Sequence, residues 1–388
     1  MINTTYYQDL TKMNTFGMKV KARCFMEYDS VADLVDIEFE ELARPVLHIG
    51  GGSNLLFTDD FKGTVLHSKI NFIEILQNGH GSGDHPHDPN TVLVSVGSGV
   101  VFDDFCAWAA KEGLWGVENL SYIPGEVGAS AVQNIGAYGV EVKDVIRKVY
   151  CYDTVEEEFV SFGVEECEYG YRDSIFKDPE VKGRYIVTHV VFALSRTPQP
   201  RLDYGHLRDA VMASSVSLSS DPRSATSSLT HPLAGGGMSL PSDTEEAMMS
   251  RLTPALIRKV IIKIRKEKLP EPSVMGSAGS FFKNPVITAE HFARIEAAAK
   301  SEYGPEYKVS HYDLPDGTVK VPAAWMIEQC GWKGRRSGGA AVYDKQPLVI
   351  VNYTGDAYPE EIVGLERRII ASVKAKFDID LHPEVEHI

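Results

Sequence analysis

Short apolar runs rich in β-branched residues recur in the first half of the chain. Those at 45–52, 91–97 and 184–194 read PVLHIGGG, TVLVSVG and RYIVTHVVFAL, and Gly, Asn or Pro residues bound them. Runs of this length and composition between turn residues are typical of strands. We therefore predict three β-strands at these positions.

Three longer segments carry apolar residues at helical spacing, which predicts helices over 101–113, 253–270 and about 360–376. Thr253 is the expected N-cap of the second helix, and the proline after it suits the first helical position. Gly113 is the expected C-cap of the first helix. The residues expected to face the core are Phe102, Phe105, Trp108, Ala109, Ile257, Val260, Ile261, Ile264, Ile362, Val363, Ile369, Ile370 and Val373.

Two stretches interrupt this pattern. Residues 78–90 read NGHGSGDHPHDPN, which is turn chemistry throughout and predicts a surface loop. The histidines His80, His85 and His87 could bind a metal, but a solvated loop is the better explanation. Between 214 and 250, eleven of 37 residues are serine. Such a stretch buries too little apolar surface to fold, so we expect a flexible insertion.

The strands and helices fall into two blocks with a break near 198–200, which indicates an α+β protein with two globular parts. The 388 residues are 43% hydrophobic, and this length suggests two or three domains. The net charge of −15 argues against binding to a nucleic-acid backbone, which needs a basic surface. It does not exclude an anionic small substrate, because a few local cations can outweigh a distant negative surface.

Five widely spaced cysteines without a C-x-x-C pair predict buried free thiols, not a disulfide scaffold or a zinc site. The N-terminus has no apolar signal region, and no run of about 18 apolar residues occurs. We expect a soluble cytoplasmic protein.

Two glycine-rich segments favour a bound cofactor. The first, GGGSN at 50–54, follows a predicted strand, and its glycines would let backbone N–H groups approach a phosphate. Taken alone, a turn that ends a strand explains it better. The second, LSYIPGEVGASAVQNIGAYG at 120–139, consists of small residues without an amphipathic period, as expected for backbone against a large flat ligand. Neither is a Walker loop or a dinucleotide-binding motif.

These segments resemble the UDP-N-acetylenolpyruvoylglucosamine reductase family. The resemblance continues, in matching order from NTFG at 14–17 to the C-terminus, through GYRDSIFK (170–177), R-x-x-KLP (265–270), GSAGSFFKNP (276–285), WKG (332–334), SGGAAVY (337–343) and PEV (383–385). It implies noncovalent FAD in a two-lobed domain of the vanillyl-alcohol-oxidase (PCMH) type at 1–197. It further implies an α+β substrate-binding domain at 198–376, with the insertion at about 214–250, and a tail at 377–388 that returns to the flavin.

The resemblance also implies the chemistry. NADPH would reduce FAD, and a hydride would pass from flavin N5 to the enolpyruvyl group of the UDP-N-acetylglucosamine substrate in peptidoglycan precursor synthesis. Ser280 matches the proton donor, Arg172 the arginine beside the substrate carboxylate, and Glu384 the carboxylate that assists the intermediate. Without the family, Ser280 is an ordinary loop serine, Arg172 a partner for Asp173, and Glu384 a solvated acid.

Further positions match ligand contacts of the family. Those for the substrate are Tyr171, Tyr204, Arg265, Lys268, Asn284, Tyr312, Lys333 and Gln346, with Tyr312 in a possible lid. Those for the cofactor are Gly50, Gly51, Gly52, Ser53, Asn54, Pro124, Gly125, Gly128, Ala129, Ser130, Gln133, Asn134, Gly136, Ala137 and Tyr138. We expect a monomer with FAD and NADPH, without a metal, a nucleic-acid partner or membrane insertion.

Two other functions stay open. An FAD-dependent oxidase of a small alcohol or sugar would leave Lys268, Asn284 and Lys333 without a role, and an obvious His or Cys tether for covalent flavin is lacking. A non-catalytic nucleotide-sugar binding protein predicts loss of the proton donor or the arginine, yet Ser280 and Arg172 are both present.

Overall fold

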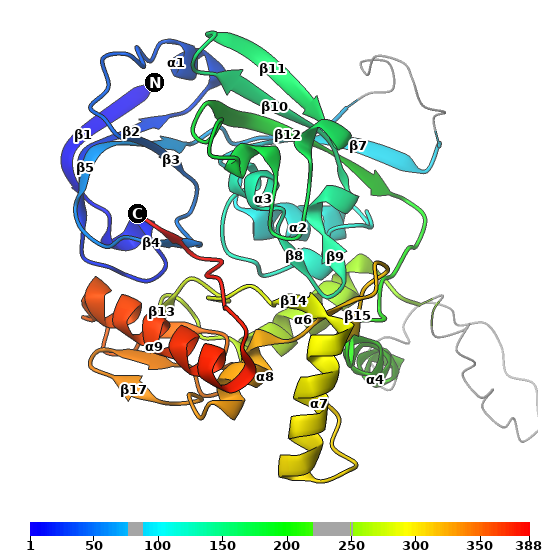
Figure 1. Ribbon diagram of the computed structural model, residues 1–388. Helices are drawn as coiled ribbons and strands as arrows, with labels where there is room; N and C mark the ends of the chain where they lie inside the picture. Colours follow the sequence, from blue (N-terminus) through cyan, green and yellow to red (C-terminus); the bar gives the residue numbers. More distant parts are fainter. Residues whose placement is uncertain (77–87, 220–248, 250) are drawn as a thin grey trace, which may run out of the picture. The chain divides into compact units, whose positions relative to one another are not determined.

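The computed structural model describes residues 1–76, 88–219, 249 and 251–388 (Figure 1). The chain divides into two compact units. The terminal unit comprises Met1–Ser68 and Lys266–Ile388, and the central unit comprises Lys69–Arg265. Both ends of the chain therefore belong to the same unit.

The terminal unit begins with a four-stranded sheet. Its order is β1 (Ile2–Asp9), β2 (Lys21–Tyr28), β5 (Phe61–Ser68) and β3 (Val46–Ile49). The β1–β2 pair is antiparallel, whereas β5 runs parallel to both β2 and β3. Strand β3 confirms the strand predicted at 45–52. The short helix α1 (Val31–Val35) follows β2.

The C-terminal part of this unit contains two further small sheets and three helices. One sheet has the order β13 (Gly276–Ser277), β19 (Ile350–Asn352), β18 (Ala340–Val342) and β17 (Arg336–Ser337). The other has the order β14 (Val286–Thr288), β16 (Thr318–Lys320) and β15 (Tyr312–Asp313). The helices are α7 (Ala289–Tyr303), α8 (Ala323–Gln329) and α9 (Pro359–Phe377).

Helix α9 confirms the helix predicted near 360–376. Its Ile362, Ile369 and Val373 are fully buried, while Val363 and Ile370 pack partly buried against the same core. That core also contains apolar residues of the first 65 positions. Burial of both chain ends in one core explains why they form one unit.

The central unit contains a five-stranded sheet in which all neighbours are antiparallel. Its order is β11 (Glu158–Gly163), β10 (Ile146–Asp153), β12 (Tyr185–Ser195), β7 (Thr91–Gly97) and β6 (Ile73–Ile75). Strands β7 and β12 confirm the strands predicted at 91–97 and 184–194. The helices α2 (Phe102–Lys111) and α3 (Val127–Gln133) share the apolar core of this sheet.

The C-cap of α2 is Glu112, one residue before the expected Gly113. Gly113 comes directly after the cap and has a φ of +71°, the left-handed value that favours glycine there. Helix α6 runs from Pro254 to Lys268, and its Leu256 N–H donates to Thr253 Oγ1 at 3.1 Å, so Thr253 is the N-cap. On α2, Phe102, Phe105 and Ala109 are buried as expected, whereas Trp108 is only partly buried.

The expected serine-rich insertion begins later than its composition indicates. Helix α4 (Leu207–Ser219) includes the first six positions of the 214–250 stretch. Positions 220–248 and 250, like His80, His85 and His87, lie outside the described residues.

All five cysteines are free; Cys24, Cys106, Cys151 and Cys167 are buried, and Cys330 is partly buried. Within the described ranges, no helix is long and apolar enough to cross a membrane, and no group of three or more His, Cys, Asp or Glu residues could hold a metal.

Candidate active site

The GGGSN loop follows β3 in the terminal unit and packs against the N-terminal segment. Gly52 has a φ of +61°, and a Cβ placed on it would lie 2.0 Å from the carbonyl oxygen of Met13. The N–H of Thr15 donates to the Gly52 carbonyl at 3.1 Å. Glycine is therefore required at this position by the protein's own backbone. A nearby ligand is not needed to explain it.

The C-terminal tail lies along the same loop. Asn54 Nδ2 donates to the carbonyl of Glu384 at 3.0 Å, and Glu386 N–H donates to the carbonyl of Asn54 at 2.9 Å. Next to this contact, β20 (Glu386–His387) pairs in parallel with β4 (Leu55–Leu56). These bonds fix the backbone of Glu384 beside the glycine-rich loop.

Ser280 lies on a segment that pairs with this tail. Phe281 is fully buried, and its carbonyl accepts a hydrogen bond from Glu384 N–H at 2.8 Å. Phe282 and Pro383 form an antiparallel bridge. Ser280 is exposed, next to the buried pair Phe281 and Phe282. The structure thus brings Ser280 and Glu384, which are far apart in the sequence, onto adjacent backbone segments.

Two predicted substrate contacts have structural partners in the terminal unit. Asn284 Oδ1 accepts a hydrogen bond from Ala323 N–H, the first residue of α8, at 2.9 Å. Lys333 Nζ forms an ion pair with Glu328 at 2.7 Å. Both pairs orient the side chains, so a ligand phosphate would have to compete with Glu328 for Lys333.

The other predicted contacts of this unit lie on its surface or in turns. Lys268 is the exposed last residue of α6, and Tyr312 on β15 is 41% exposed. Gln346 Oε1 accepts a hydrogen bond from Leu348 N–H at 3.5 Å. The carbonyl of Leu348 in turn accepts a hydrogen bond from Phe281 N–H at 2.8 Å, which connects the Gln346 turn to the Ser280 segment.

In the central unit, the second glycine-rich segment packs closely on the turn before α2. Gly128 N–H donates to the Ser98 carbonyl at 2.9 Å, and a Cβ on Gly128 would lie 2.8 Å from Ser98 Cβ. Gly125, with a φ of +119°, accepts a hydrogen bond from Phe102 N–H at 3.0 Å. The small residues of this segment therefore serve internal packing at least in part.

The predicted cofactor residues of this unit occupy one continuous stretch. Pro124 and Gly125 precede α3, on which lie Gly128, Ala129, Ser130 and Gln133; Asn134 is its C-cap, and Gly136, Ala137 and Tyr138 follow at β8 (Gly136–Ala137). Asn134 and Tyr138 have φ values of +47° and +50°, which are unfavourable for residues with a side chain. Unfavourable backbone of this kind clusters at functional sites.

Arg172 also has a positive φ, +56°, and its side chain points to the same stretch. Its Nη2 donates to the Gly136 carbonyl at 2.6 Å and its Nη1 to the Asn134 carbonyl at 3.3 Å. The guanidinium carbon lies 5.3 Å from the centre of the Tyr171 ring. The structure therefore brings together Arg172, Tyr171 and the predicted cofactor residues.

Arg265 and Tyr204 are near this stretch as well. Arg265 Nε donates to the Tyr122 carbonyl at 3.1 Å, and burial lowers the pKa of Arg265 below its usual value. Tyr204 contacts Tyr138 edge to face, with ring centres 6.1 Å apart, and is 43% exposed. Both residues thus adjoin the glycine-rich segment of their own unit.

Two residues of this region were not predicted from the sequence. Asp103 at the start of α2 accepts two hydrogen bonds from the guanidinium of Arg258 and one from the N–H of Tyr122. Burial raises the pKa of Asp103, but the bonds from Arg258 and Tyr122 outweigh it, so the pKa is lowered. The only signal in the sequence was that Arg258 lies seven positions before Arg265 on a basic helix.

One buried polar atom indicates that the central unit fits a ligand. Gln133 Nε2 is buried without a hydrogen-bond partner among the described residues. Buried amide groups are normally paired, so an acceptor is expected from a bound molecule or from water. A flavin, with its many acceptor atoms and flat ring, is compatible with this donor and with the small residues around it.

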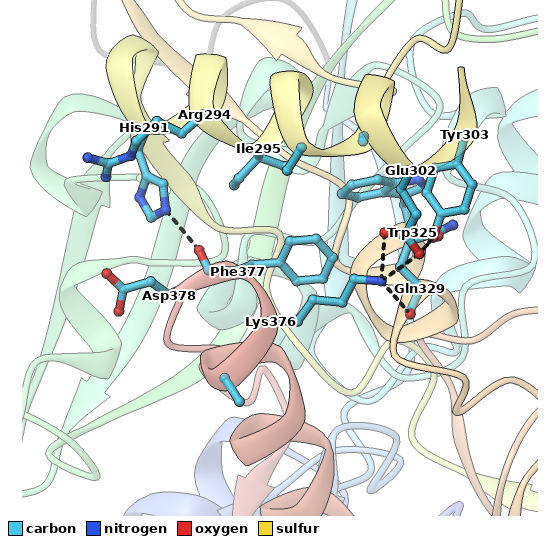
Figure 2. Close-up of a pocket in the computed structure, with 13 residues that line it drawn as sticks. His291, Arg294, Ile295, Glu302, Tyr303, Trp325, Gln329, Lys376, Phe377 and Asp378 are labelled. Atoms are coloured by element: carbon cyan, nitrogen blue, oxygen red, sulfur yellow. Dashed lines mark hydrogen bonds and ion pairs between the residues drawn. The ribbon is translucent and has the colours of Figure 1, made fainter. Parts of the chain in front are cut away.

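The pocket shown in Figure 2 lies elsewhere in the terminal unit. It has a volume of about 380 Å³ and is lined by residues of α7, α8 and the end of α9, including Ile295, Trp325 and Phe377. Lys376 reaches Glu302 and the Gln329 carbonyl at one end of it. None of the predicted site residues lines this pocket.

The chain matches known proteins over nearly its whole length. Residues 23–158 match the FAD binding domain family, and residues 271–388 match the C-terminal domain of UDP-N-acetylenolpyruvoylglucosamine reductase. The Bacteroides fragilis protein of this name is 45% identical over 380 residues, 98% of each chain. The Porphyromonas gingivalis protein is 41% identical over 384 residues, covering 98% of this chain and 97% of its own.

The chain belongs to the UDP-N-acetylenolpyruvoylglucosamine reductase family. It is an oxidoreductase with an FAD-binding domain, and FAD is its cofactor. The structure of the Thermus caldophilus reductase of this family aligns with 100% of this chain and 98% of its own, with a TM-score of 0.58 and 20% identity. This likeness confirms the predicted α+β fold of the reductase family.

Proposed function

We propose that the protein reduces UDP-N-acetylglucosamine enolpyruvate to UDP-N-acetylmuramate with electrons from NADPH. The observation that carries the proposal is the pairing of the Ser280 segment with the tail through the Glu384 N–H bond to Phe281, at 2.8 Å. This bond joins the backbone of Glu384 to that of the residue after Ser280, which supports a shared role for Ser280 and Glu384. Relatives 41–45% identical over nearly the full chain carry the name of this activity.

FAD, when bound, would supply the hydride. The chain's own task is then to handle the charge and the proton on the substrate. Addition of hydride to the vinyl carbon leaves negative charge on the neighbouring carbon and on the carboxylate. Ser280 Oγ donates the proton to that carbon. A hydroxyl is a weak acid, but a carbanion-like carbon is a strong base, so the transfer is favourable when the geometry is fixed.

Arg172 stabilises the carboxylate as charge builds up on it. A planar guanidinium suits bidentate pairing with a carboxylate. The carbonyls of Asn134 and Gly136 hold the plane of the guanidinium in one orientation. Fixed donors of this kind stabilise a developing charge without having to reorganise during the reaction. Glu384 assists at the same intermediate, from the segment paired with that of Ser280.

The remaining residues are proposed to bind the sugar nucleotide. Cationic, aromatic and amide side chains suit its diphosphate, uracil and sugar. The residues proposed for this role are Tyr171, Tyr204, Arg265, Lys268, Asn284, Tyr312, Lys333 and Gln346. The proposed ligand roles divide the chain into an FAD-binding part at 1–197, a substrate-binding part at 198–376 and a tail at 377–388. We further propose that the enzyme is a monomer and acts in the cytoplasm.

The proton transfer can be tested with a matched pair of serine variants. Ser280→Ala removes the proposed donor, and Ser273→Ala removes an exposed serine a few positions earlier. Under anaerobic conditions, NADPH should bleach the flavin of both variants at the wild-type rate. Recolouring by the enolpyruvyl sugar nucleotide should slow by about 10²- to 10⁴-fold in Ser280→Ala alone, the usual effect of losing general acid catalysis.

Normal recolouring in Ser280→Ala would remove this serine from the mechanism. Recolouring of the wild-type protein by oxygen but not by the sugar nucleotide would favour the oxidase. Absence of bleaching would favour a binding protein without catalysis.

A further inference from the structure

Lys177 joins two parts of the proposed site in the central unit. It ends the short 3₁₀ turn Ile175–Lys177, and its Nζ donates to Gln133 Oε1 at 2.8 Å and to the Arg172 carbonyl at 2.9 Å. One ammonium group thus contacts the last residue of α3 and the backbone of the proposed carboxylate-binding arginine. The sequence predicts no role for Lys177, so neither contact was expected.

The first contact fixes the orientation of the Gln133 amide. A lysine ammonium can only donate hydrogen bonds, so it must face the amide oxygen and not the amide nitrogen. The nitrogen, Nε2, then points the other way. This Nε2 is buried and has no hydrogen-bond partner among the residues that the structure describes. Lys177 therefore leaves the NH₂ group of Gln133 buried and in need of an acceptor.

The second contact, to the Arg172 carbonyl, holds a residue whose backbone conformation is unfavourable. Arg172 has a φ of +56°, and Lys177 binds the carbonyl group of this residue. The Arg172 guanidinium in turn binds the carbonyls of Asn134 and Gly136. The Arg172 segment is thus bound to the Gln133 segment at two places. One is the guanidinium of Arg172, and the other is its backbone carbonyl, which Lys177 links to Gln133.

Two further bonds join the same pair of segments. Asn134 Nδ2 donates to the Gly170 carbonyl at 2.7 Å, and Ser174 Oγ donates to the Val132 carbonyl at 2.6 Å. These two bonds involve uncharged groups. The bond from Lys177 is charge-assisted and is therefore the stronger kind.

We propose that Lys177 is a positioning residue that turns the amide N–H of Gln133 toward an acceptor atom of FAD and fixes the backbone of Arg172. The role of Arg172 in this inference rests on the proposed function. The contact between Gln133 and FAD requires only that the protein binds FAD. The acceptor is assigned to FAD because Gln133 belongs to the small-residue stretch at 120–139. It follows that loss of the ammonium lets the Gln133 amide rotate and weakens cofactor binding.

The test compares three lysine variants of the holoprotein. Lys177→Met removes the donor at similar volume, Lys177→Arg keeps a donor, and Lys182→Met removes an exposed lysine from the same part of the chain. FAD release on dilution is followed by the rise of free-flavin fluorescence, and the visible spectrum of the bound flavin is recorded. We expect the Kd for FAD to rise about 10-fold or more in Lys177→Met, as for loss of a hydrogen bond to a charged group. Its spectrum should also shift, Lys177→Arg should recover most of the affinity, and Lys182→Met should resemble the wild type.

A double-mutant cycle with Gln133→Leu separates this account from a general loss of stability. If Lys177 acts through the Gln133 amide, Gln133→Leu alone weakens FAD binding, and adding Lys177→Met to it weakens binding little further. Additive losses, or an unchanged Kd and spectrum in Lys177→Met with only a lower Tm, would overturn the proposal. So would an unchanged Kd in Gln133→Leu, since water would then be the acceptor.

These measurements need neither NADPH nor the sugar nucleotide. Weaker FAD binding in a protein that does not turn over the enolpyruvyl substrate would support the role of Lys177 and contradict the proposed reaction. If the wild-type protein turns over the enolpyruvyl substrate but Lys177→Met changes neither the Kd for FAD nor the flavin spectrum, the proposed reaction is supported and the role of Lys177 is contradicted.

Discussion

Replacement of Gly52 by alanine tests why the GGGSN loop contains glycine. The residue has a φ of +61°, and the added Cβ would lie 2.0 Å from the carbonyl oxygen of Met13 and 2.8 Å from its carbonyl carbon. These are backbone atoms, which cannot rotate away as a flexible side chain would. The hydrogen bond from Thr15 N–H to the Gly52 carbonyl, at 3.1 Å, lies at the same contact.

Gly17 provides a control with nearly the same backbone conformation. Its φ is +67°, but the nearest atom to an added Cβ is Asn352 Nδ2 at 4.0 Å. Gly17→Ala should therefore cost only the left-handed conformation of a residue with Cβ, about 1–2 kcal/mol. Gly52→Ala adds a steric cost of about 1–3 kcal/mol, as for overpacking, and its total should be about 2–5 kcal/mol.

The assay is urea unfolding of both variants beside the wild type, with FAD release on dilution as a second readout. We expect a lower unfolding midpoint for Gly52→Ala than for Gly17→Ala. The displaced loop should also release FAD faster, while Gly17→Ala should retain it. Equal midpoints for the two variants would refute the reasoning that the Met13 backbone is what requires glycine at position 52.

Three further predictions concern single contacts. Asp103→Ala should lower the free energy of unfolding by about 3–5 kcal/mol in urea titrations, because Arg258 loses its partner in a partly buried site; Asp104→Ala, at an exposed position of the same helix, should cost little. Thr253→Ala should cost about 1 kcal/mol by the same method, through loss of the N-cap of α6, and a cost near zero would show that the cap is not used. The hydrogen bond that His387 Nε2 donates to the Glu366 carboxylate raises the pKa of His387 above 6.5, although burial opposes it. That stabilisation is fully present below the unfolded-state pKa and is lost as pH rises through the raised folded-state pKa. The wild-type urea midpoint should therefore fall between about pH 6 and pH 8 more than that of His387→Asn, and parallel pH profiles would contradict this.

Local features of the fold could be predicted from the sequence. Strand β7 occupies the predicted residues 91–97, and the N-cap at Thr253 is where the sequence places it. Each of these depends on neighbouring residues, namely an apolar run between turns and a cap before a helix. The motif around Ser280 is also continuous in the sequence, so it could be recognised there, and the role of Ser280 stays a prediction.

Contacts between distant segments could not be predicted in this way. Strand β2 pairs in parallel with β5, and the pairing of β20 with β4 joins the C-terminal end of the chain to its N-terminal part. Apolar periodicity says nothing about such pairing. Asp103 and Lys177 were missed for the same reason. Each has its partners on another segment, and a single charged residue in a helix or turn gives no sign of them.

The most direct test of the central claim is anaerobic recolouring of the reduced protein. The purified protein is bleached with one equivalent of NADPH, and the enolpyruvyl sugar nucleotide is then added while the flavin absorbance is followed. We predict that the colour returns without oxygen and that UDP-N-acetylmuramate forms in the same amount as the NADPH consumed. A flavin that stays bleached until oxygen is admitted would contradict the proposed reaction.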